Sequence, residues 1–223
     1  MKEYVRLKEF WNSCFSGLSG EKIEGRFISD ANFNNAMNLY LKDGYKLLDY
    51  GCGTGWASFE LAQMKNLSEI IGIDPSINAV NYANECAEKS SFNNMKFISS
   101  DESELNNYID YFDMAISVNT LDVVPDEIIE SILLNVSKSL KKDGVFIVCL
   151  NPLFDEKFML ETIKLEKREN CFFKDDVLRC NYKNVEEWKK VFSKYFDFQE
   201  YLTFAISENE TIYPRQMYIL VRK

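Results

Sequence analysis

The sequence predicts an α/β fold of three layers, in which a doubly wound, seven-stranded and mostly parallel sheet lies between helices. Three observations predict it. A short apolar strand at 45–50 runs through a glycine-rich turn into a helix at 56–64. Apolar strands and amphipathic helices then alternate up to residue 150, as expected of a parallel sheet. The last two strands, 198–205 and 216–222, are joined by a polar turn and should form an antiparallel hairpin, which makes the last strand antiparallel.

The other elements follow the same periodicities. Ser29 and Asp30 begin a helix with apolar residues at helical spacing, and Gly44 ends it before the first strand. Residues 103–110 are too few for a crossover helix and predict one or two turns. The remaining strands are expected at 69–74, 95–99, 111–118 and 145–150, and a strong amphipathic helix is expected from 126 to 140.

Two segments lie outside this alternation. Residues 1–28 begin with an aromatic-rich helix, which either packs on the edge of the domain or forms a lid over bound ligands. Residues 151–183 exceed a simple loop, and we expect a partly helical insert that shapes a substrate pocket. An edge or dimer element is the alternative. We expect residues 1–223 to form one domain with a sizeable core.

Composition excludes several classes of protein. The formal net charge of −9 disfavours a nucleic-acid or anionic-membrane surface. Without a run of 18 apolar residues or a signal-peptide pattern, the chain is expected to be cytoplasmic and not to enter a membrane. The six cysteines form no C-x-x-C pair and are expected as free thiols. Because the chain has no histidine and no evident metal cluster, acid–base chemistry falls to other side chains.

The glycine turn indicates the kind of nucleotide. Gly51, Gly53 and Gly55 follow a G-x-G-x-G spacing, whereas a dinucleotide fingerprint requires G-x-G-x-x-G. Asp49 precedes the first glycine, and its carboxylate would repel a pyrophosphate at close range. A carboxylate suits a ligand that brings a cation to the same place. S-adenosyl-L-methionine (SAM) does so with its ammonium and sulfonium groups.

The stretch from Asp49 to Gly55 resembles the first motif, D/E-x-G-x-G-x-G, of the class I SAM-dependent methyltransferases at every fixed position. The resemblance extends over about residues 29–150 and, by topology, to the antiparallel last strand. It implies methyl transfer from SAM to an O, N or C nucleophile of a small-molecule acceptor, with S-adenosyl-L-homocysteine (SAH) as product. Two alternatives stay open, an NAD-dependent oxidoreductase and a non-catalytic module that binds SAM or SAH. The sequence does not indicate an oligomeric state.

Several residues are expected to contact this cofactor. Asp74 ends the second strand, where an acid can accept hydrogen bonds from both ribose hydroxyls. The resemblance implies that Pro75 and Ile77 lie against the adenine ring and that Asp101, followed by Glu102, accepts from the adenine amino group. The other interpretation of Asp101 is a helix N-cap followed by first-turn acids.

Trp11, in the N-terminal aromatic helix, is expected to cover the cofactor if that helix is a lid. Arg26 could reach the carboxylate at the methionine end of the cofactor, but an exposed surface arginine is the favoured interpretation.

Three residues are candidates for contact with the acceptor. Asn119 ends the fourth strand over the cofactor, where it would orient an acceptor or hold the turn. Asp122 lies in Leu-Asp-Val-Val-Pro, which resembles a family segment except that Val123 stands where that segment has histidine. Tyr213 lies just before the last strand. We expect Asn119, Asp122 and Tyr213 to be the residues from which catalytic groups are drawn.

Overall fold

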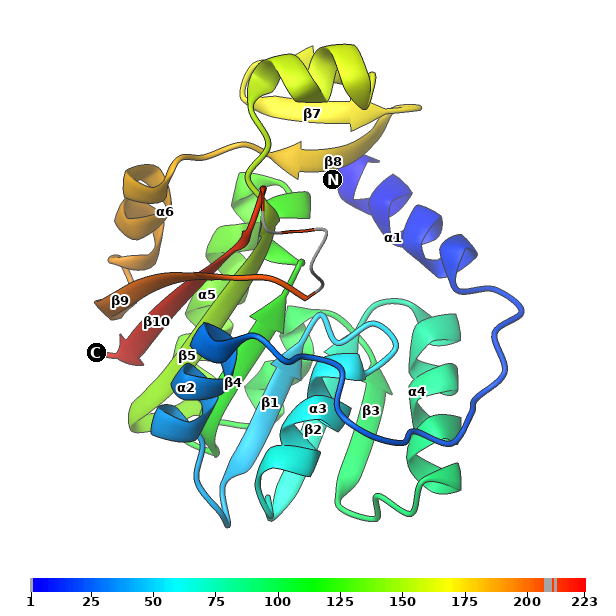
Figure 1. Ribbon diagram of the computed structural model, residues 1–223, viewed down its shortest axis with the longest axis vertical. Coiled ribbons are helices and arrows are strands. Elements are labelled where there is room, and N and C mark those ends of the chain that lie inside the picture. Colours follow the sequence, from blue (N-terminus) through cyan, green and yellow to red (C-terminus); the bar gives the residue numbers. More distant parts are fainter. Residues whose placement is uncertain (1, 207–209, 211) are drawn as a thin grey trace.

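The computed structural model describes residues 2–206, 210 and 212–223. Seven strands form one sheet in the order β3-β2-β1-β4-β5-β10-β9 (Figure 1). The first five strands of the chain pair in parallel, and β10 is antiparallel to both β5 and β9. The strands are β1 (Lys46–Tyr50), β2 (Glu69–Asp74), β3 (Met95–Ser99), β4 (Phe112–Val118), β5 (Leu140–Pro152), β9 (Phe196–Phe204) and β10 (Arg215–Arg222). This topology confirms the predicted fold class, including the antiparallel last strand.

Helices cover both faces of the sheet (Figure 1). Asp30 caps the first of them by accepting a hydrogen bond from the backbone N–H of Phe33, as predicted. The helices beside the sheet are α2 (Ala31–Tyr40), α3 (Trp56–Met64), α4 (Ile77–Lys89), α5 (Asp126–Ser139) and α6 (Val185–Phe192). Two short 3₁₀ helices, η1 (Glu102–Asn107) and η2 (Leu121–Val123), complete the connections, and η1 confirms the short turns predicted there.

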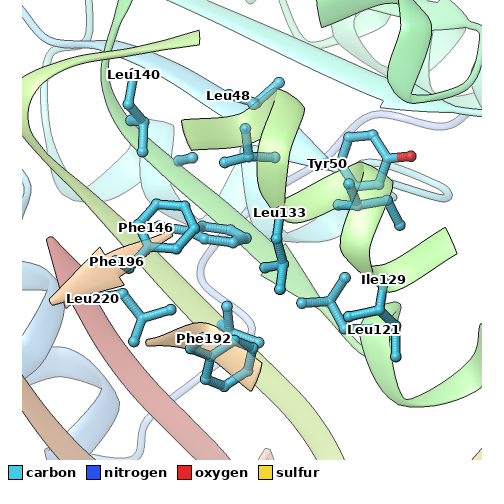
Figure 2. Close-up of a cluster of buried hydrophobic side chains, with 14 of the residues drawn as sticks. Leu48, Tyr50, Leu121, Ile129, Leu133, Leu140, Phe146, Phe192, Phe196 and Leu220 are labelled. Carbon is cyan, nitrogen blue, oxygen red and sulfur yellow. The ribbon is translucent and has the colours of Figure 1, made fainter. Parts of the chain in front are cut away.

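Neighbouring residues of β1 divide the core between the two faces, because successive side chains of a strand point to opposite sides. Leu47 is buried with residues of α2 and α3, whereas Leu48 is buried with residues of α5 and α6. Figure 2 shows the second of these clusters, in which Leu133 of α5, Phe146 of β5 and Phe192 of α6 meet. Helices therefore bury both faces of the sheet. The carboxyl ends of the parallel strands are the part of the sheet where a ligand site can form.

The insert at 151–183 contains a helical segment and also a small sheet that the sequence does not predict. The helical segment covers residues 156–162 and includes the π-helical turn η3 (Phe158–Thr162). The rest is an antiparallel three-stranded sheet of β6 (Glu166–Arg168), β7 (Cys171–Lys174) and β8 (Val177–Asn181). The pairing of β7 with β8 shifts register between Phe172 and Phe173, and both rings are buried. This bulge breaks the period of two that would have indicated a strand.

The N-terminal helix α1 (Lys2–Cys14) and the insert sheet both lie beyond the carboxyl ends of the parallel strands (Figure 1). The chain after α1 then runs back along α4. The backbone N–H of Gly20 donates to Glu85 at 2.8 Å, and Lys89 donates to the Gly20 carbonyl at 2.5 Å. These contacts hold the return segment in place and leave α1 facing the insert.

Candidate active site

A cavity of about 700 Å³ lies at the carboxyl ends of β1, β2 and β4. This is where open α/β sheets bind their ligands, and the volume falls within the range of small-molecule sites. One side is formed by the glycine turn and the strand ends, and the other by α1 and the insert. The cavity thus joins the segments that the sequence assigned separately to a cofactor and to an acceptor.

The glycine turn needs glycine for two different reasons. Gly51 has a φ of 71°, and a Cβ there would lie 2.2 Å from the Thr120 hydroxyl, so the turn packs tightly against the end of β4. Gly53 has a φ of 51°, and a Cβ there would have only the Phe15 ring within 4 Å, at 3.9 Å. The absent side chain of Gly53 therefore leaves room for a ligand on bare backbone. Gly55 caps α3 and does not line the cavity.

Asp74 lies at the end of β2 and lines the cavity, as predicted. Its Oδ2 accepts from the Gly53 N–H at 2.9 Å, and its Oδ1 accepts from the Ser76 N–H at 2.8 Å. Burial raises the pKa of this carboxyl. Each oxygen keeps a lone pair that a ribose hydroxyl can use. Pro75 also lines the cavity, whereas Ile77 is 48% exposed and does not.

Asp49 lies behind the glycine turn and is absent from the cavity lining. It is fully buried, and one carboxylate oxygen accepts from the Ser58 hydroxyl at 2.7 Å. Burial raises the pKa of Asp49 to about 7. Any attraction between Asp49 and a cofactor cation therefore acts through the turn, and its contribution stays a prediction.

Asp101 and Glu102 lie outside the cavity lining. Asp101 is the N-cap of η1: it accepts from both the hydroxyl and the N–H of Ser103, and the hydroxyl bond lowers its pKa. This is the capping role that the sequence offered as the other interpretation. Glu102 accepts from the Tyr50 hydroxyl at 3.5 Å. The predicted contacts of both acids with adenine stay predictions.

Arg26 does not reach the cavity, contrary to one of the two expectations for it. Its Nε donates to Glu60 at 2.8 Å, and Nη2 also bonds Glu60 at 2.6 Å. Glu60 is completely buried, and the Phe27 N–H is its other donor. A buried carboxylate needs such a partner, so this ion pair takes the guanidinium away from the cofactor side. No pattern in the sequence indicates that Glu60 is buried.

The strand end at β4 is held in an unusual conformation. Asn119 lines the cavity with a φ of 57°, and its Oδ1 accepts from Arg215 Nη1 at 2.8 Å. Its own N–H donates to the Cys149 carbonyl at 2.8 Å. These contacts fit the turn-holding interpretation of Asn119. The positive φ of Asn119 ends the extended conformation of β4 at this residue.

Asp122 of η2 lines the cavity and is 7% exposed. Its Oδ2 accepts from the Asn151 N–H at 3.0 Å, while its Oδ1 is buried and has no hydrogen-bond partner among the described residues. Burial raises the pKa of this carboxyl. Asp122 is therefore a buried acid at the cavity wall with one carboxylate oxygen unpaired among the described residues, and perturbed acids of this kind are frequent at functional sites.

Tyr213 does not line the cavity. Its ring packs against Phe154 and Phe158, with centroids 5.0 Å and 5.4 Å away. Phe154 does line the cavity, so Tyr213 supports that wall from behind. A catalytic contact of Tyr213 would need a movement of Phe154.

The helix α1 forms one wall of the cavity. Trp11 lines it and stacks on Phe15 at a centroid distance of 6.1 Å. Tyr4 lines it too, and its pKa is raised by burial and by the carboxylates of Glu102, Asp101 and Asp74. The lid interpretation therefore agrees with the position of α1. Tyr4 was not singled out as a site residue, although it belongs to the aromatic pattern of this helix.

The insert forms the wall beside α1, and the sequence does not predict most of its lining residues individually. They are largely apolar or aromatic, with a few cations. The lining residues of this wall include Met159, Ile163, Leu165, Lys174, Arg179, Cys180, Asn181, Tyr182 and Lys183. No sequence signal marked Arg179 or Cys180, because the strand that carries them was not expected.

Within the described residues, no group of three or more acidic or cysteine side chains is arranged to hold a metal ion. No helix in this part of the chain is long and apolar enough to cross a membrane.

Comparison with known proteins identifies the family. A model of a methyltransferase domain matches residues 41–200, which is well over half of the chain. The chain therefore belongs to the class I SAM-dependent methyltransferases, as the Asp49–Gly55 motif indicated. The dinucleotide alternative is set aside by this match. SAM is the methyl donor that the family implies, and the open side of Gly53 together with the free lone pairs of Asp74 fits its nucleoside.

Individual relatives are more distant. A ubiquinone/menaquinone biosynthesis C-methyltransferase of Campylobacter jejuni is 34% identical over 118 residues, which cover 50% of this chain and 47% of the relative. The chain thus spans about half the length of that relative. A protein from Pyrococcus horikoshii has a similar structure, with a TM-score of 0.67, 20% identity, and coverage of 89% of this chain and 94% of the other. A SAM-dependent methyltransferase from Methanosarcina mazei is similar too, with a TM-score of 0.65, 20% identity, and coverage of 84% of this chain and 96% of the other.

Proposed function

We propose that this protein transfers a methyl group from SAM to a small molecule bound in the same cavity. One observation supports this above all. The cavity runs without interruption from the glycine turn after β1 to the wall formed by β8, under cover of α1. A donor on the turn and an acceptor beside the insert would share one enclosed volume. A protein that only sensed SAM would not need the second half of that volume.

The residues on the donor side bind SAM and orient its methyl group. Bound SAM supplies an electrophilic methyl carbon, whose bond to sulfur breaks as a lone pair of the acceptor bonds to it. Asp74 holds the ribose and Gly53 leaves its backbone open beside it, while Trp11 and Tyr4 close the cavity from α1. Holding the reacting atoms in line can contribute about 7–11 kcal/mol toward lowering the barrier.

Asp122 is the residue proposed to accept a proton when the acceptor is an O–H or N–H group. Its Oδ1 is free of protein partners within the described chain, and burial raises its pKa toward the range in which a carboxylate is an effective base. Asn119 is proposed to hold the turn beneath the acceptor through its bond from Arg215.

We also propose that residues 1–28 act as the lid and that residues 151–183 shape the acceptor pocket. Both segments contribute side chains to the cavity. Between them they form the walls on the side away from the glycine turn, so the choice of acceptor is set by these two segments and not by the parallel sheet.

The test is titration calorimetry with SAM, SAH and NAD, on the protein and on Asp74→Ala. Micromolar binding of both adenosyl compounds, weakened at least tenfold in the variant, is expected. Binding of NAD alone would overturn the proposal. Turnover is then measured by mass spectrometry as conversion of SAM to SAH with a panel of small acceptors. A protein that binds SAM without converting it with any acceptor would be a binding module.

A further inference from the structure

The acceptor side of the cavity contains a cation that forms no ion pair with any described residue. Arg179 of β8 lines the cavity, and its Nε is inaccessible to solvent and has no hydrogen-bond partner among the residues that the structure describes. Within the described part of the chain, no carboxylate forms an ion pair with its guanidinium. Leaving buried donors unpaired is unfavourable, and guanidinium groups in proteins are normally matched by an anion.

The guanidinium is also held in a defined orientation. Its central carbon lies 3.9 Å from the centroid of the Phe10 ring of α1, a cation–π contact. Phe10 in turn packs edge-on against Trp11, which lines the cavity. A planar cation fixed against a ring presents its N–H groups in a constant direction, which is the arrangement that binds a carboxylate with two parallel hydrogen bonds.

Three lysines line the same cavity, Lys8 of α1, Lys174 and Lys183. Lys183 donates to Asp126 at 2.6 Å and to Asn181, so its charge is neutralised. Lys174 is exposed at the cavity edge. Asp74 and Asp122 are the acids of the described cavity lining, and both are assigned above to other tasks. In a chain with a net charge of −9, an unpaired arginine in a cavity points to an anionic ligand.

The surrounding walls define the rest of the ligand. The lining of the cavity that contains Arg179 is largely apolar and aromatic, and it includes Leu7, Trp11, Met159, Tyr182 and Trp188. Such walls suit a ring or a short apolar body, and the planar guanidinium of Arg179 matches one carboxylate. We propose that Arg179 binds the carboxylate of the methyl acceptor, so that the substrates are small aromatic or apolar carboxylic acids. This inference rests on the proposed function, because it assigns the acceptor side of the same cavity.

The test compares acids with their amides on SAH-loaded protein. The probes are benzoate, 3-phenylpropionate and 2-naphthoate, each beside its primary amide, with calorimetry and tryptophan fluorescence as readouts. Trp11 and Trp188 both line the cavity, so their emission reports on binding there. We expect at least one acid to bind about tenfold more tightly than its amide, as a charge-assisted hydrogen bond predicts.

Variants then assign the preference to one residue. Arg179→Gln should bind acid and amide within about twofold of each other, with amide affinity unchanged. Arg179→Lys should keep part of the preference. Arg6→Gln is the matched control: Arg6 lies on α1, is more than half exposed and does not line the cavity. Thermal unfolding and SAH affinity confirm that each variant is folded.

Equal binding of acids and amides, no binding of any acid, or a preference that survives in Arg179→Gln would overturn the inference. The proposed function fails separately, because it is contradicted by loss of SAM and SAH binding to the unaltered protein. The acid–amide comparison is repeated without SAH, so it stays decisive in that case.

Discussion

The backbone N–H of Gly53 donates a hydrogen bond of 2.9 Å to the carboxylate of Asp74. The residue that leaves its backbone open to a ligand is thereby tied to the acid expected to bind the ribose. The turn after β1 and the end of β2 therefore form one unit. A substitution at either residue should alter the conformation of the other.

Replacing Asp74 tests this coupling. In Asp74→Ala the N–H groups of Gly53 and Ser76 lose their acceptor. We expect the free energy of unfolding to fall by about 2 kcal/mol, since each buried unpaired donor costs about 1–3 kcal/mol and solvent can reach part of this site. Urea denaturation measures it. Asp197→Ala, at an exposed position of β9, is the control and should change the free energy by less than about 0.5 kcal/mol.

Two glycine-to-alanine variants should fail in different ways. Gly51→Ala places a Cβ within 2.2 Å of Thr120, so we expect a loss of about 2–3 kcal/mol of stability by thermal or urea denaturation. Gly53→Ala meets no such clash, and its strain is about 1–2 kcal/mol. Its methyl group enters the ligand space instead, so calorimetry should show SAH binding weakened more than tenfold. Normal SAH affinity in Gly53→Ala would argue against binding on that backbone.

Asp49 should make stability depend on pH. Its pKa is raised from 3.8 to about 7 in the folded protein, so its contribution is fully present below about pH 4 and is lost as the pH rises through about 7. A difference of about three pKa units corresponds to roughly 4 kcal/mol. Asp49→Asn keeps an acceptor for the Ser58 hydroxyl and cannot ionise. Urea denaturation from pH 4 to pH 8 should show the unaltered protein losing stability relative to this variant. A constant difference across that range would mean that Asp49 titrates normally.

The ion pair of Arg26 and Glu60 is expected to matter for stability and not for catalysis. Arg26→Ala leaves a fully buried carboxylate with only the Phe27 N–H as a donor, so we expect the free energy of unfolding to fall by about 3 kcal/mol. Adding Glu60→Gln should recover part of that loss, because the amide carries no charge. SAH affinity should stay unchanged in both variants. The exposed pair of Lys22 and Glu24 is the control, and Lys22→Ala should change stability by less than about 1 kcal/mol.

The sheet could be predicted because its signals are local. Each parallel strand is a short apolar run bounded by turns, and the spacing of Gly51, Gly53 and Gly55 distinguishes the nucleotide class. Asp74 and Pro75 follow from strand ends, since a parallel sheet gathers them at one edge. Gly51, Gly53, Asp74 and Pro75 line the cavity, whereas Gly55 does not.

The remainder depended on contacts between distant segments. Arg26 pairs with Glu60. The pattern of apolar residues in α3 does not reveal that residues 26–27 cover Glu60. Asp101 accepts hydrogen bonds from the nearby Ser103, so its carboxylate caps η1 locally. Arg179 lies on β8, whose neighbour β7 contains a bulge, and the sequence does not predict either strand. Such features arise from tertiary packing and leave no periodic trace.

The contact between α1 and β8 joins two segments separated by most of the sheet-forming sequence (Figure 1). Closing so long a loop is entropically unfavourable, so we expect this contact to open at a lower free-energy cost than the sheet. If residues 1–28 act as the proposed lid, the cation–π contact between Arg179 and Phe10 holds that lid closed, and small molecules enter when α1 moves away. The rate of amide hydrogen exchange in α1 would therefore report how often the cavity opens to ligands. A bound carboxylic acid would slow that exchange by holding α1 against β8.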